Sequence, residues 1–143
     1  EGHPCKSDRG LHETIMYHEV LKFIAKKHAG QKRLNGNPYI IHPIRVSQEV
    51  QGVAKIVALL HDVIEDTDAT LEELRAAFGD QVAETVEVLT HRKGESWLDY
   101  IARVKQNDLA TTVKIADIAD NLADSPSDHA IEKSAKALDI LIN

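Results

Sequence analysis

Cysteine, aromatic residues and long apolar runs are scarce in this chain. Its 143 residues include one cysteine, Cys5, which excludes a disulfide within the chain and fits a reducing compartment. No apolar stretch approaches the ~20 residues that cross a bilayer, and the first residues lack the apolar core of a signal peptide. We therefore expect a cytoplasmic protein that does not span a membrane, with a flexible N-terminus over residues 1–7.

Positive charge is also scarce. Lys and Arg number 17 against 23 Asp and Glu, so the formal net charge is −6. A general nucleic-acid binder needs a basic face, so this balance argues against nucleic acid as a partner. A small polyanionic substrate is still compatible with it, because a bound divalent metal ion can reverse the local field. The oligomeric state does not follow from the sequence.

The composition and spacing of apolar residues predict an all-α fold. Aromatic residues make up 4% of the chain, while Ala, Leu, Ile and Val are plentiful, which suits helices packed on helices. Alternation of the strand type is absent, and apolar residues recur at helical spacing. We predict a single domain over residues 1–143, a helical bundle of about eight helices.

Capping and turn residues mark the expected helix boundaries. Ser7 or Asp8 can cap the first helix, Thr70 with Glu73 forms a capping box, and Ser96 can cap a later helix. The helices are expected from about residue 8 to residue 29, from Pro43 onward, from Val53 to Ile64, from Thr70 to Phe78, from Gln81 to Thr90, from Ser96 to Gln106, from Leu109 (capped by Asp108) to Leu122, and from about residue 128 to Leu141.

The most distinctive segment is an apolar run that ends in ionisable side chains. Residues 57–60 are Val, Ala, Leu and Leu, and His61, Asp62, Glu65 and Asp66 follow them. On a continuous helix, positions four apart share a face, so His61 would stack with Glu65 and Asp62 with Asp66. Such a helix end would direct four metal-binding or proton-handling groups to one place. The alternative is a solvated acidic helix end.

Two other stretches add candidate ligands. Lys114, Asp117 and Asn121 share one helical face, and Asp117 lies in an apolar-rich segment, where an unpaired carboxylate would be costly to bury. A metal ion, or Lys114, would relieve that cost, whereas the alternative is a surface Lys–Asp pair followed by an Asn cap. His42 lies in an apolar stretch and is either a metal ligand or a hydrogen-bonded core histidine.

Four of these side chains together supply two imidazoles and two carboxylates: His42, His61, Asp62 and Asp117. This mixed set suits a six-coordinate divalent ion with open water positions, such as Mn²⁺ or Fe²⁺, with Zn²⁺ as an alternative. Such an ion acidifies water and screens phosphate charge, while a neighbouring carboxylate accepts the proton. The residues therefore predict a metal-dependent hydrolase with Glu65 or Asp66 as the proton acceptor.

With these motifs in order, the chain resembles the HD phosphohydrolase superfamily and, within it, the hydrolase domain of Rel/Spo homologues and the small alarmone hydrolases. The resemblance runs from about Leu11 to Asp124. It rests on residues 31–43, which include Gln-Lys-Arg and Pro-Tyr-Ile-Ile-His-Pro, and on residues 58–67, 78–79, 88–90 and 113–121. It implies an HD-type helical fold and Mn²⁺ bound by the four side chains above. The implied reaction removes the 3′-pyrophosphate of guanosine tetra- or pentaphosphate, leaving GDP or GTP.

The resemblance also implies roles for other side chains. Glu65 and Asp66 match a pair that activates or positions the attacking water. Asn121 matches a residue near the ribose and phosphates, and Arg33 one that packs against the base, as a guanidinium plane can. Four basic side chains are expected to make the substrate pocket locally positive: Lys32, Arg33, Arg45 and Lys114.

Three positions depart from the family pattern. Leu34 replaces the basic residue that usually follows the base-stacking arginine, Ile118 replaces an Arg or Lys, and Asp120 replaces a His or Tyr. These changes leave the metal ligands intact and bear on base selectivity. Asp120 and Asp124 are themselves expected to face solvent, and the alternative is that they are extra acids near the metal ion.

Two other functions are compatible with the same residues. One is an HD hydrolase for a different nucleotide, such as an adenosine alarmone, NADPH or a nucleoside phosphate. The other is a nucleotide-sensing module that binds without turnover. Retention of both Glu65 and Asp66 argues against the sensing module, because a binder does not need a water-activating pair.

Overall fold

The computed structural model describes residues 6–143, with side chains from His12 onward, and these residues form nine α-helices and no strand. Residues 1–5 of the predicted flexible N-terminus lie outside the described residues, and the first helix begins at Lys6. The helices are α1 (Lys6–Lys27), α2 (Ile41–Gln48), α3 (Val53–Leu60), α4 (Val63–Asp66), α5 (Leu71–Phe78), α6 (Asp80–Leu89), α7 (Trp97–Lys105), α8 (Asp108–Leu122) and α9 (Asp128–Ile142). The predicted all-α fold is confirmed. Over the described helices, none combines the length and the apolar character that a membrane crossing requires.

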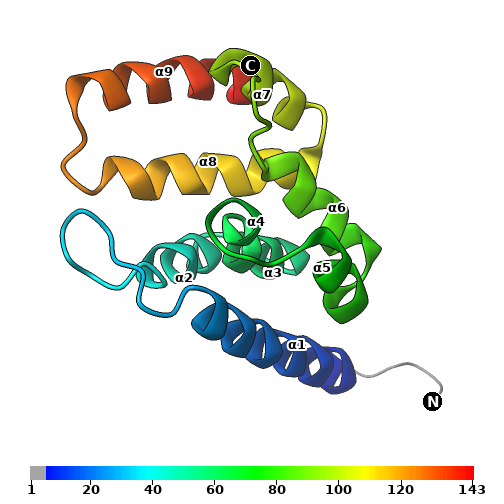
Figure 1. Ribbon diagram of the computed structural model, residues 1–143. Coiled ribbons are helices and arrows are strands. Elements are labelled where there is room, and N and C mark those ends of the chain that lie inside the picture. Colours follow the sequence, from blue (N-terminus) through cyan, green and yellow to red (C-terminus); the bar gives the residue numbers. More distant parts are fainter. Residues whose placement is uncertain (1–5) are drawn as a thin grey trace.

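Helix α3 forms the centre of the bundle. Six of its eight residues are buried, so it is covered on nearly all sides. It packs against α1, α2, α6 and α8. In Figure 1, α2 and α3 lie between α1 on one side and α8 on the other, and α9 covers the far side of α8. The end of α3 therefore meets α2 and α8 in the interior.

Side-chain caps start several helices. Thr70 Oγ1 accepts the Glu73 N–H at 3.1 Å, and the Glu73 carboxylate accepts the Thr70 N–H at 3.0 Å, so the predicted capping box is confirmed. Ser96 caps α7 as predicted. Asp108 does not cap α8, because Asn107 has the extended backbone of an N-cap and its side chain accepts a first-turn N–H at 2.9 Å.

The predicted continuous helix over residues 53–64 is wrong. α3 and α4 are separate helices with His61 and Asp62 in the turn between them, which raises the number of helices from about eight to nine. The His61 N–H bonds to the carbonyl three residues back at 3.4 Å, and Asp62 has φ −106° and ψ 2°, outside the helical range. The expected stacking of His61 on Glu65 along one helix therefore does not occur. Asp62 and Asp66 keep their one-turn spacing, because the Asp66 N–H donates to the Asp62 carbonyl at 3.0 Å.

An ion pair closes the loop between α6 and α7. Arg103 Nε and Nη2 lie 2.8 and 2.9 Å from the two carboxylate oxygens of Glu95, and the same guanidinium donates to the carbonyls of Val88 and Thr90 at 2.9 Å. Hydrogen bonds from Arg103 lower the pKa of Glu95 to about 2, against a smaller opposing effect of burial. Two parallel hydrogen bonds make this ion pair stronger than a pair joined by a single hydrogen bond.

We expect Glu95→Gln to lower the free energy of unfolding at neutral pH and to have a smaller effect in acid. The folded pKa of Glu95 lies below its ordinary value, so the carboxylate stabilises the fold above pH 4.5 and loses this effect as the pH falls toward about 2. Urea unfolding of both proteins at neutral pH and at about pH 3 measures the change. Glu84→Gln, on the exposed face of α6, is the control. A pH-independent difference would contradict the expectation.

Candidate active site

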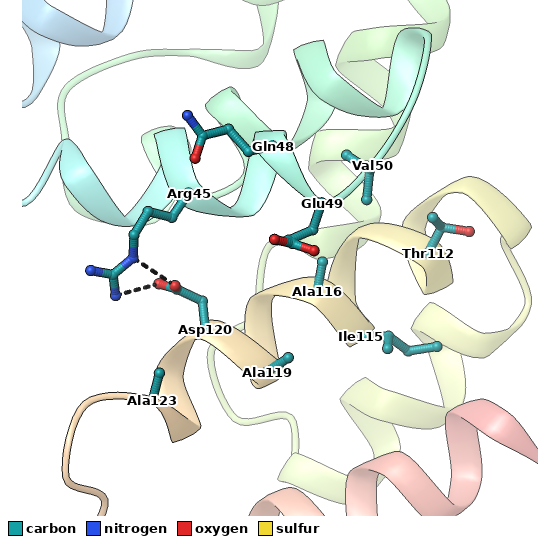
Figure 2. Close-up of a pocket in the computed structure, with 10 residues that line it drawn as sticks. All are labelled: Arg45, Gln48, Glu49, Val50, Thr112, Ile115, Ala116, Ala119, Asp120 and Ala123. Carbon is teal, nitrogen blue, oxygen red and sulfur yellow. Dashed lines mark hydrogen bonds and ion pairs between the residues drawn. The ribbon is translucent and has the colours of Figure 1, made fainter.

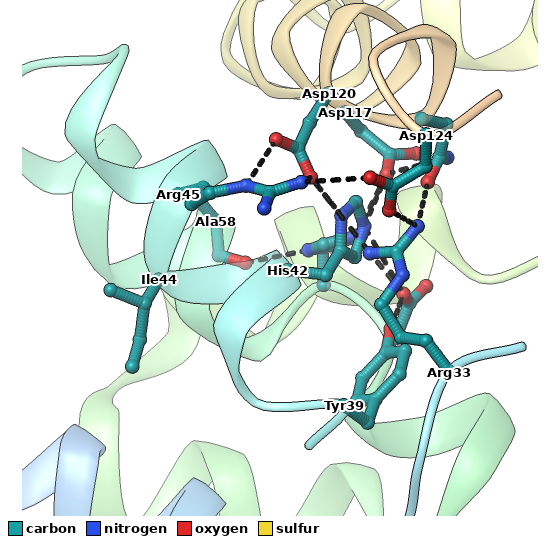
Figure 3. Close-up of polar contacts among 12 residues, drawn as sticks. Arg33, Tyr39, His42, Ile44, Arg45, Ala58, Asp117, Asp120 and Asp124 are labelled. Atoms are coloured by element: carbon teal, nitrogen blue, oxygen red, sulfur yellow. Dashed lines mark hydrogen bonds and ion pairs between the residues drawn. The ribbon is translucent and has the colours of Figure 1, made fainter. Parts of the chain in front are cut away.

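Two histidines and an aspartate converge inside the bundle. His42 comes from α2, His61 from the turn after α3, and Asp117 from α8. All three are buried, and one ligand atom of each lies within 4.8 Å of the others. Asp117 Oδ1 lies 2.8 Å from His42 Nε2 and 3.2 Å from His61 Nε2. Side chains from three distant parts of the sequence thus meet, and Figure 3 shows two of them, His42 and Asp117, pointing toward one another.

Asp62, the fourth predicted ligand, lies at the edge of this cluster. Its Oδ2 is 3.1 Å from His61 Nε2 and 3.9 Å from His42 Nε2, and its side chain is 24% exposed. It also accepts a hydrogen bond from the Tyr39 hydroxyl. Burial opposes ionisation of this carboxyl, but the charge of His61 and the hydrogen bonds lower its pKa to about 2. Asp62 is therefore an ionised group between the buried cluster and the opening.

The outer nitrogen of each histidine is held by an acceptor. His42 Nδ1 lies 2.7 Å from Asp120 Oδ2, and His61 Nδ1 lies 2.6 Å from the Ala58 carbonyl oxygen. An acceptor at Nδ1 fixes the Nδ1–H tautomer and leaves the Nε2 lone pair directed inward, as around metal-binding histidines. Both Nε2 atoms face Asp117 Oδ1, which is also an acceptor. Facing acceptors need a proton or a metal ion between them, and two inward Nε2 atoms beside a carboxylate fit a divalent metal ion.

The charges of the cluster compensate one another. Burial disfavours an ionised Asp117, but Lys114, whose Nζ lies 3.0 Å from Oδ2, and the neighbouring histidines hold the pKa of Asp117 well below its ordinary value. Burial would lower the pKa of His61, but the charges of Asp62 and Asp117 raise it well above its ordinary value. Two neighbouring carboxylates in the interior require nearby positive charge. A divalent ion would supply it in place of the proton on His61.

Glu65 and Asp66, the predicted proton acceptors, lie in α4 beside the cluster. Asp66 lines the cavity that contains His42 and Asp62. Glu65 Oε1 accepts the His91 backbone N–H at 2.5 Å, which ties α4 to the loop after α6. Burial raises the pKa of both carboxyl groups, and the charge of Asp62 adds to the effect. A carboxylate with a raised pKa accepts a proton more readily near neutral pH.

The cluster opens into a cavity of about 590 Å³, a size that suits a nucleotide. The walls come from the loop before α2, from α2, from the turn after α3, from α4 and α8, and from the N-terminal halves of α7 and α9. Four of the five residues predicted for the substrate pocket line the cavity: Lys32, Arg33, Lys114 and Asn121. The prediction for the fifth, Arg45, is wrong, because Arg45 lines a different cavity and pairs with Asp120. The lining residues that were not predicted as substrate contacts include Asn35, Trp97, Asp124 and Lys133.

The predicted substrate-binding residues differ in the contacts they already make. Arg33 Nη2 donates to Asn121 Oδ1 at 3.0 Å and lies 3.1 Å from Asp124 Oδ2. The buried Nη1 of Arg33 has no hydrogen-bond partner among the described residues. Lys114 Nζ donates a hydrogen bond to the Asp117 carboxylate, so its charge already balances a carboxylate of the cluster. Lys32 is exposed at the cavity rim.

The preferred expectation that Asp120 faces solvent is wrong, and the alternative position beside the proposed metal ligands agrees with the structure. Its side chain is 11% exposed, and its carboxylate joins His42 Nδ1 to Arg45, whose Nε lies 2.8 Å from Oδ1. Asp124 is also largely covered, with 26% of its side chain exposed. Asp117 and Asp120 are three residues apart and so share one face of α8, and Asp124 follows the end of the helix. This spacing was the signal that could have identified Asp120 as a partner of His42.

A second cavity, of about 620 Å³, lies between α2 and α8 (Figure 2). Its walls are mostly small or apolar, with Val50, Ile115 and Ala119 among them. The Arg45–Asp120 pair lies at its edge, and none of the four predicted metal ligands lines it. The chemistry therefore belongs to the cavity that holds the histidine cluster.

Comparison with known proteins identifies relatives along most of the chain. The HD domain family model matches residues 20–114. The chain is 35% identical over 114 residues to guanosine-3′,5′-bis(diphosphate) 3′-pyrophosphohydrolase of Aquifex aeolicus, which covers 71% of this chain and 16% of that protein. It is 43% identical over 90 residues to guanosine-3′,5′-bis(diphosphate) 3′-pyrophosphohydrolase MESH1 of Homo sapiens, a match that covers 57% of this chain and 50% of that enzyme. The MESH1 enzyme of Danio rerio is 38% identical over 128 residues, a match that covers 78% of this chain and 69% of that enzyme.

The fold has a solved counterpart. A structure described as a metazoan ortholog of SpoT that hydrolyzes ppGpp matches with a TM-score of 0.79 and 30% sequence identity, covering 88% of this chain and 85% of that chain. The present chain thus spans half of the human relative and a smaller part of the Aquifex aeolicus relative. The family model covers well over half of the sequence, including His42, His61 and Asp62. The chain belongs to the HD domain family.

Proposed function

We propose that this protein hydrolyses the 3′-pyrophosphate of guanosine tetraphosphate (ppGpp) and guanosine pentaphosphate, giving pyrophosphate and GDP or GTP. The observation that carries the proposal is the convergence of His42, His61 and Asp117 at the base of a cavity with basic residues in its walls. The Aquifex aeolicus and MESH1 relatives are named for this reaction, which supports guanosine alarmones as the substrate class.

We propose Mn²⁺ as the bound ion, with four ligands: His42, His61, Asp62 and Asp117. Two imidazoles and two carboxylates suit Mn²⁺ or Fe²⁺ with positions left open for water, and Zn²⁺ is the alternative. When bound, the ion acidifies water and screens the charge of the phosphates. The single cysteine, Cys5, supports the cytoplasm as the location.

Side chains of the protein provide the proton transfer. Water attacks the phosphorus that is bonded to the ribose 3′ oxygen, a new P–O bond forms, and the bond to the ribose oxygen breaks. Glu65, with Asp66 beside it, accepts the proton of the attacking water, and the ribose 3′ oxygen gains a proton. The raised pKa of each carboxyl supports this role. Lys114, which donates to Asp117 at 3.0 Å, keeps the buried carboxylate oriented.

Arg33 provides the surface for the base. Its guanidinium is held by Asn121 and Asp124, and its buried Nη1 has no hydrogen-bond partner in the described part of the chain. A guanidinium fixed in this way can stack on a purine.

We expect Arg33→Ala to raise KM for ppGpp by about tenfold and to leave Mn²⁺ affinity unchanged, because Arg33 contacts none of the four proposed ligands. Steady-state kinetics and calorimetric titration with Mn²⁺ measure the two effects. Arg75→Ala, which removes an exposed arginine of α5 paired with Asp80, is the matched control. An unchanged KM in Arg33→Ala would refute the stacking role.

A substrate panel tests the proposed specificity. Purified protein with Mn²⁺ is given ppGpp, the corresponding adenosine alarmone, NADPH and a nucleoside triphosphate, and the products are identified by anion-exchange chromatography. We expect GDP and pyrophosphate in equal amounts from ppGpp, with kcat/KM at least about tenfold above the other substrates. A higher kcat/KM for another nucleotide would retain the hydrolase chemistry and contradict guanosine specificity.

A further inference from the structure

We propose that Lys133, on α9, is an anion-binding residue of the cavity and holds the 5′-diphosphate of the nucleotide, the end that is not cleaved. The identity of the nucleotide rests on the proposed function, whereas the anion site rests on the cavity alone. Lys133 lies beyond residues 20–114, the part of the chain matched by the family model. It also lies outside the sequence motifs of the HD family resemblance, which end at Asp124.

The charges in the cavity walls leave few cations free for a polyanion. Four basic residues line the cavity: Lys32, Arg33, Lys114 and Lys133. Two of them are already paired with carboxylates, Lys114 at 3.0 Å and Arg33 at 3.1 Å. Among the residues that the structure describes, no carboxylate lies within 4.0 Å of the ammonium of Lys32 or Lys133. Four aspartates also line the cavity, so the phosphates of a nucleotide need these two free cations.

Trp97 orients Lys133 without neutralising it. Lys133 Nζ lies 4.1 Å from the centroid of the indole ring, and the indole Nε1–H donates to the Lys133 carbonyl oxygen at 3.4 Å. Both residues line the cavity. An ammonium over an indole face is attracted to the ring and keeps three N–H donors for other partners. The start of α7 and the second turn of α9 therefore present an oriented cation to a ligand.

The position of Lys133 relative to the cluster indicates which phosphates it meets. Lys114 Nζ lies 5.3 Å from the same indole centroid and contacts Asp117 directly. Within the described chain, Lys133 makes no such contact with a proposed metal ligand. The 3′-pyrophosphate has to reach the cluster to be cleaved, and the 5′-phosphates extend away from it. Lys133 is thus suited to the 5′ end.

Kinetics of two matched variants test the proposal. Lys133→Gln removes the charge, and Lys136→Gln removes a charge from the next turn of α9, from a lysine paired with Glu132 at 3.3 Å that does not line the cavity. We expect Lys133→Gln to raise KM for ppGpp about tenfold with kcat nearly unchanged, and Lys136→Gln to match the wild type. With guanosine 3′-diphosphate, which lacks 5′-phosphates, the penalty should vanish. A penalty that persists there would overturn the assignment to the 5′ end.

Fluorescence measures the same site without turnover, because Trp97 is the one tryptophan of the chain. GDP added to the Mn²⁺-loaded protein should change the emission saturably in the wild type and in Lys136→Gln. In Lys133→Gln the same change should need about tenfold more GDP. Equal titrations of Lys133→Gln and the wild type, or equal losses in both variants, would overturn the anion site. If the wild type does not hydrolyse ppGpp, the proposed function fails, and the GDP titration still decides the role of Lys133.

Discussion

Asp117→Ala is expected to abolish Mn²⁺ binding and to reduce ppGpp turnover to the uncatalysed background. Asp117 Oδ1 is the atom that faces both histidine Nε2 atoms, at 2.8 and 3.2 Å, so its removal takes away the centre of the cluster. The substitution also leaves Lys114, which is 9% exposed, without its carboxylate. An uncompensated buried charge costs about 3–5 kcal/mol, so the variant should also be less stable.

A double variant separates the loss of the metal site from the loss of stability. Asp117→Ala combined with Lys114→Met removes the unpaired charge and should recover much of the stability while Mn²⁺ binding and activity stay absent. Calorimetric titration with Mn²⁺, urea unfolding and ppGpp turnover measure the three properties. Glu72→Ala, which removes an exposed acid of α5, is the control. Full activity in Asp117→Ala would exclude Asp117 from the site.

Glu65→Gln is expected to retain Mn²⁺ binding and to lose about 10²–10⁴-fold in kcat. The amide oxygen of glutamine can still accept the His91 N–H that Glu65 accepts at 2.5 Å, so the contact between α4 and the following loop survives. The amide cannot take a proton from water. The loss should therefore appear in kcat, with Mn²⁺ affinity close to that of the wild type.

Asp66→Asn is the matched comparison for this prediction. Asp66 lines the cavity and its carboxyl has a pKa raised by burial, so it is the other candidate proton acceptor. A large loss in Glu65→Gln with a smaller loss in Asp66→Asn would assign proton transfer to Glu65. An unchanged kcat in Glu65→Gln would transfer that role to Asp66 or to another group.

The convergence of the cluster could be predicted because the sequence contains its chemistry in short motifs. A histidine and an acid directly after a buried apolar run, and an aspartate in an apolar-rich helix, are costly to bury without partners. The structure brings His42, His61 and Asp117 together, with Asp62 3.1 Å from His61 Nε2. Their role as metal ligands stays a prediction.

The break between α3 and α4 could not be predicted from local sequence. Residues 53–64 contain no proline, and helical spacing of apolar residues continues through Ile64. The turn at His61 and Asp62 is stabilised by contacts with Asp117 and Tyr39, which are distant in the sequence. Tertiary contacts of this kind override a local helical pattern.

The structure also distinguishes the three departures from the family pattern. Ile118 is buried in the core and does not line the cavity, so this change leaves the cavity wall unaltered. The Asp120 carboxylate is hydrogen-bonded to His42 and Arg45, so it is not free to contact a base. Leu34 is fully exposed and lines the cavity, which makes it the departure best placed to affect base selectivity.

The proposed anion-binding role of Lys133 could not be predicted from the sequence. A lysine on the exposed side of a terminal helix resembles any solvated lysine, and Trp97 resembles a packing residue. The contact of Lys133 with the Trp97 ring depends on how α7 and α9 pack beside α8, and apolar periodicity does not specify that packing.

The most direct test of the account is ppGpp turnover by the purified protein with Mn²⁺, with and without a chelator, following GDP and pyrophosphate. We expect release of both products in equal amounts, loss of turnover on chelation, and recovery when Mn²⁺ is restored. Turnover that persists in the chelated protein, or no turnover by protein with Mn²⁺ confirmed bound, would contradict it.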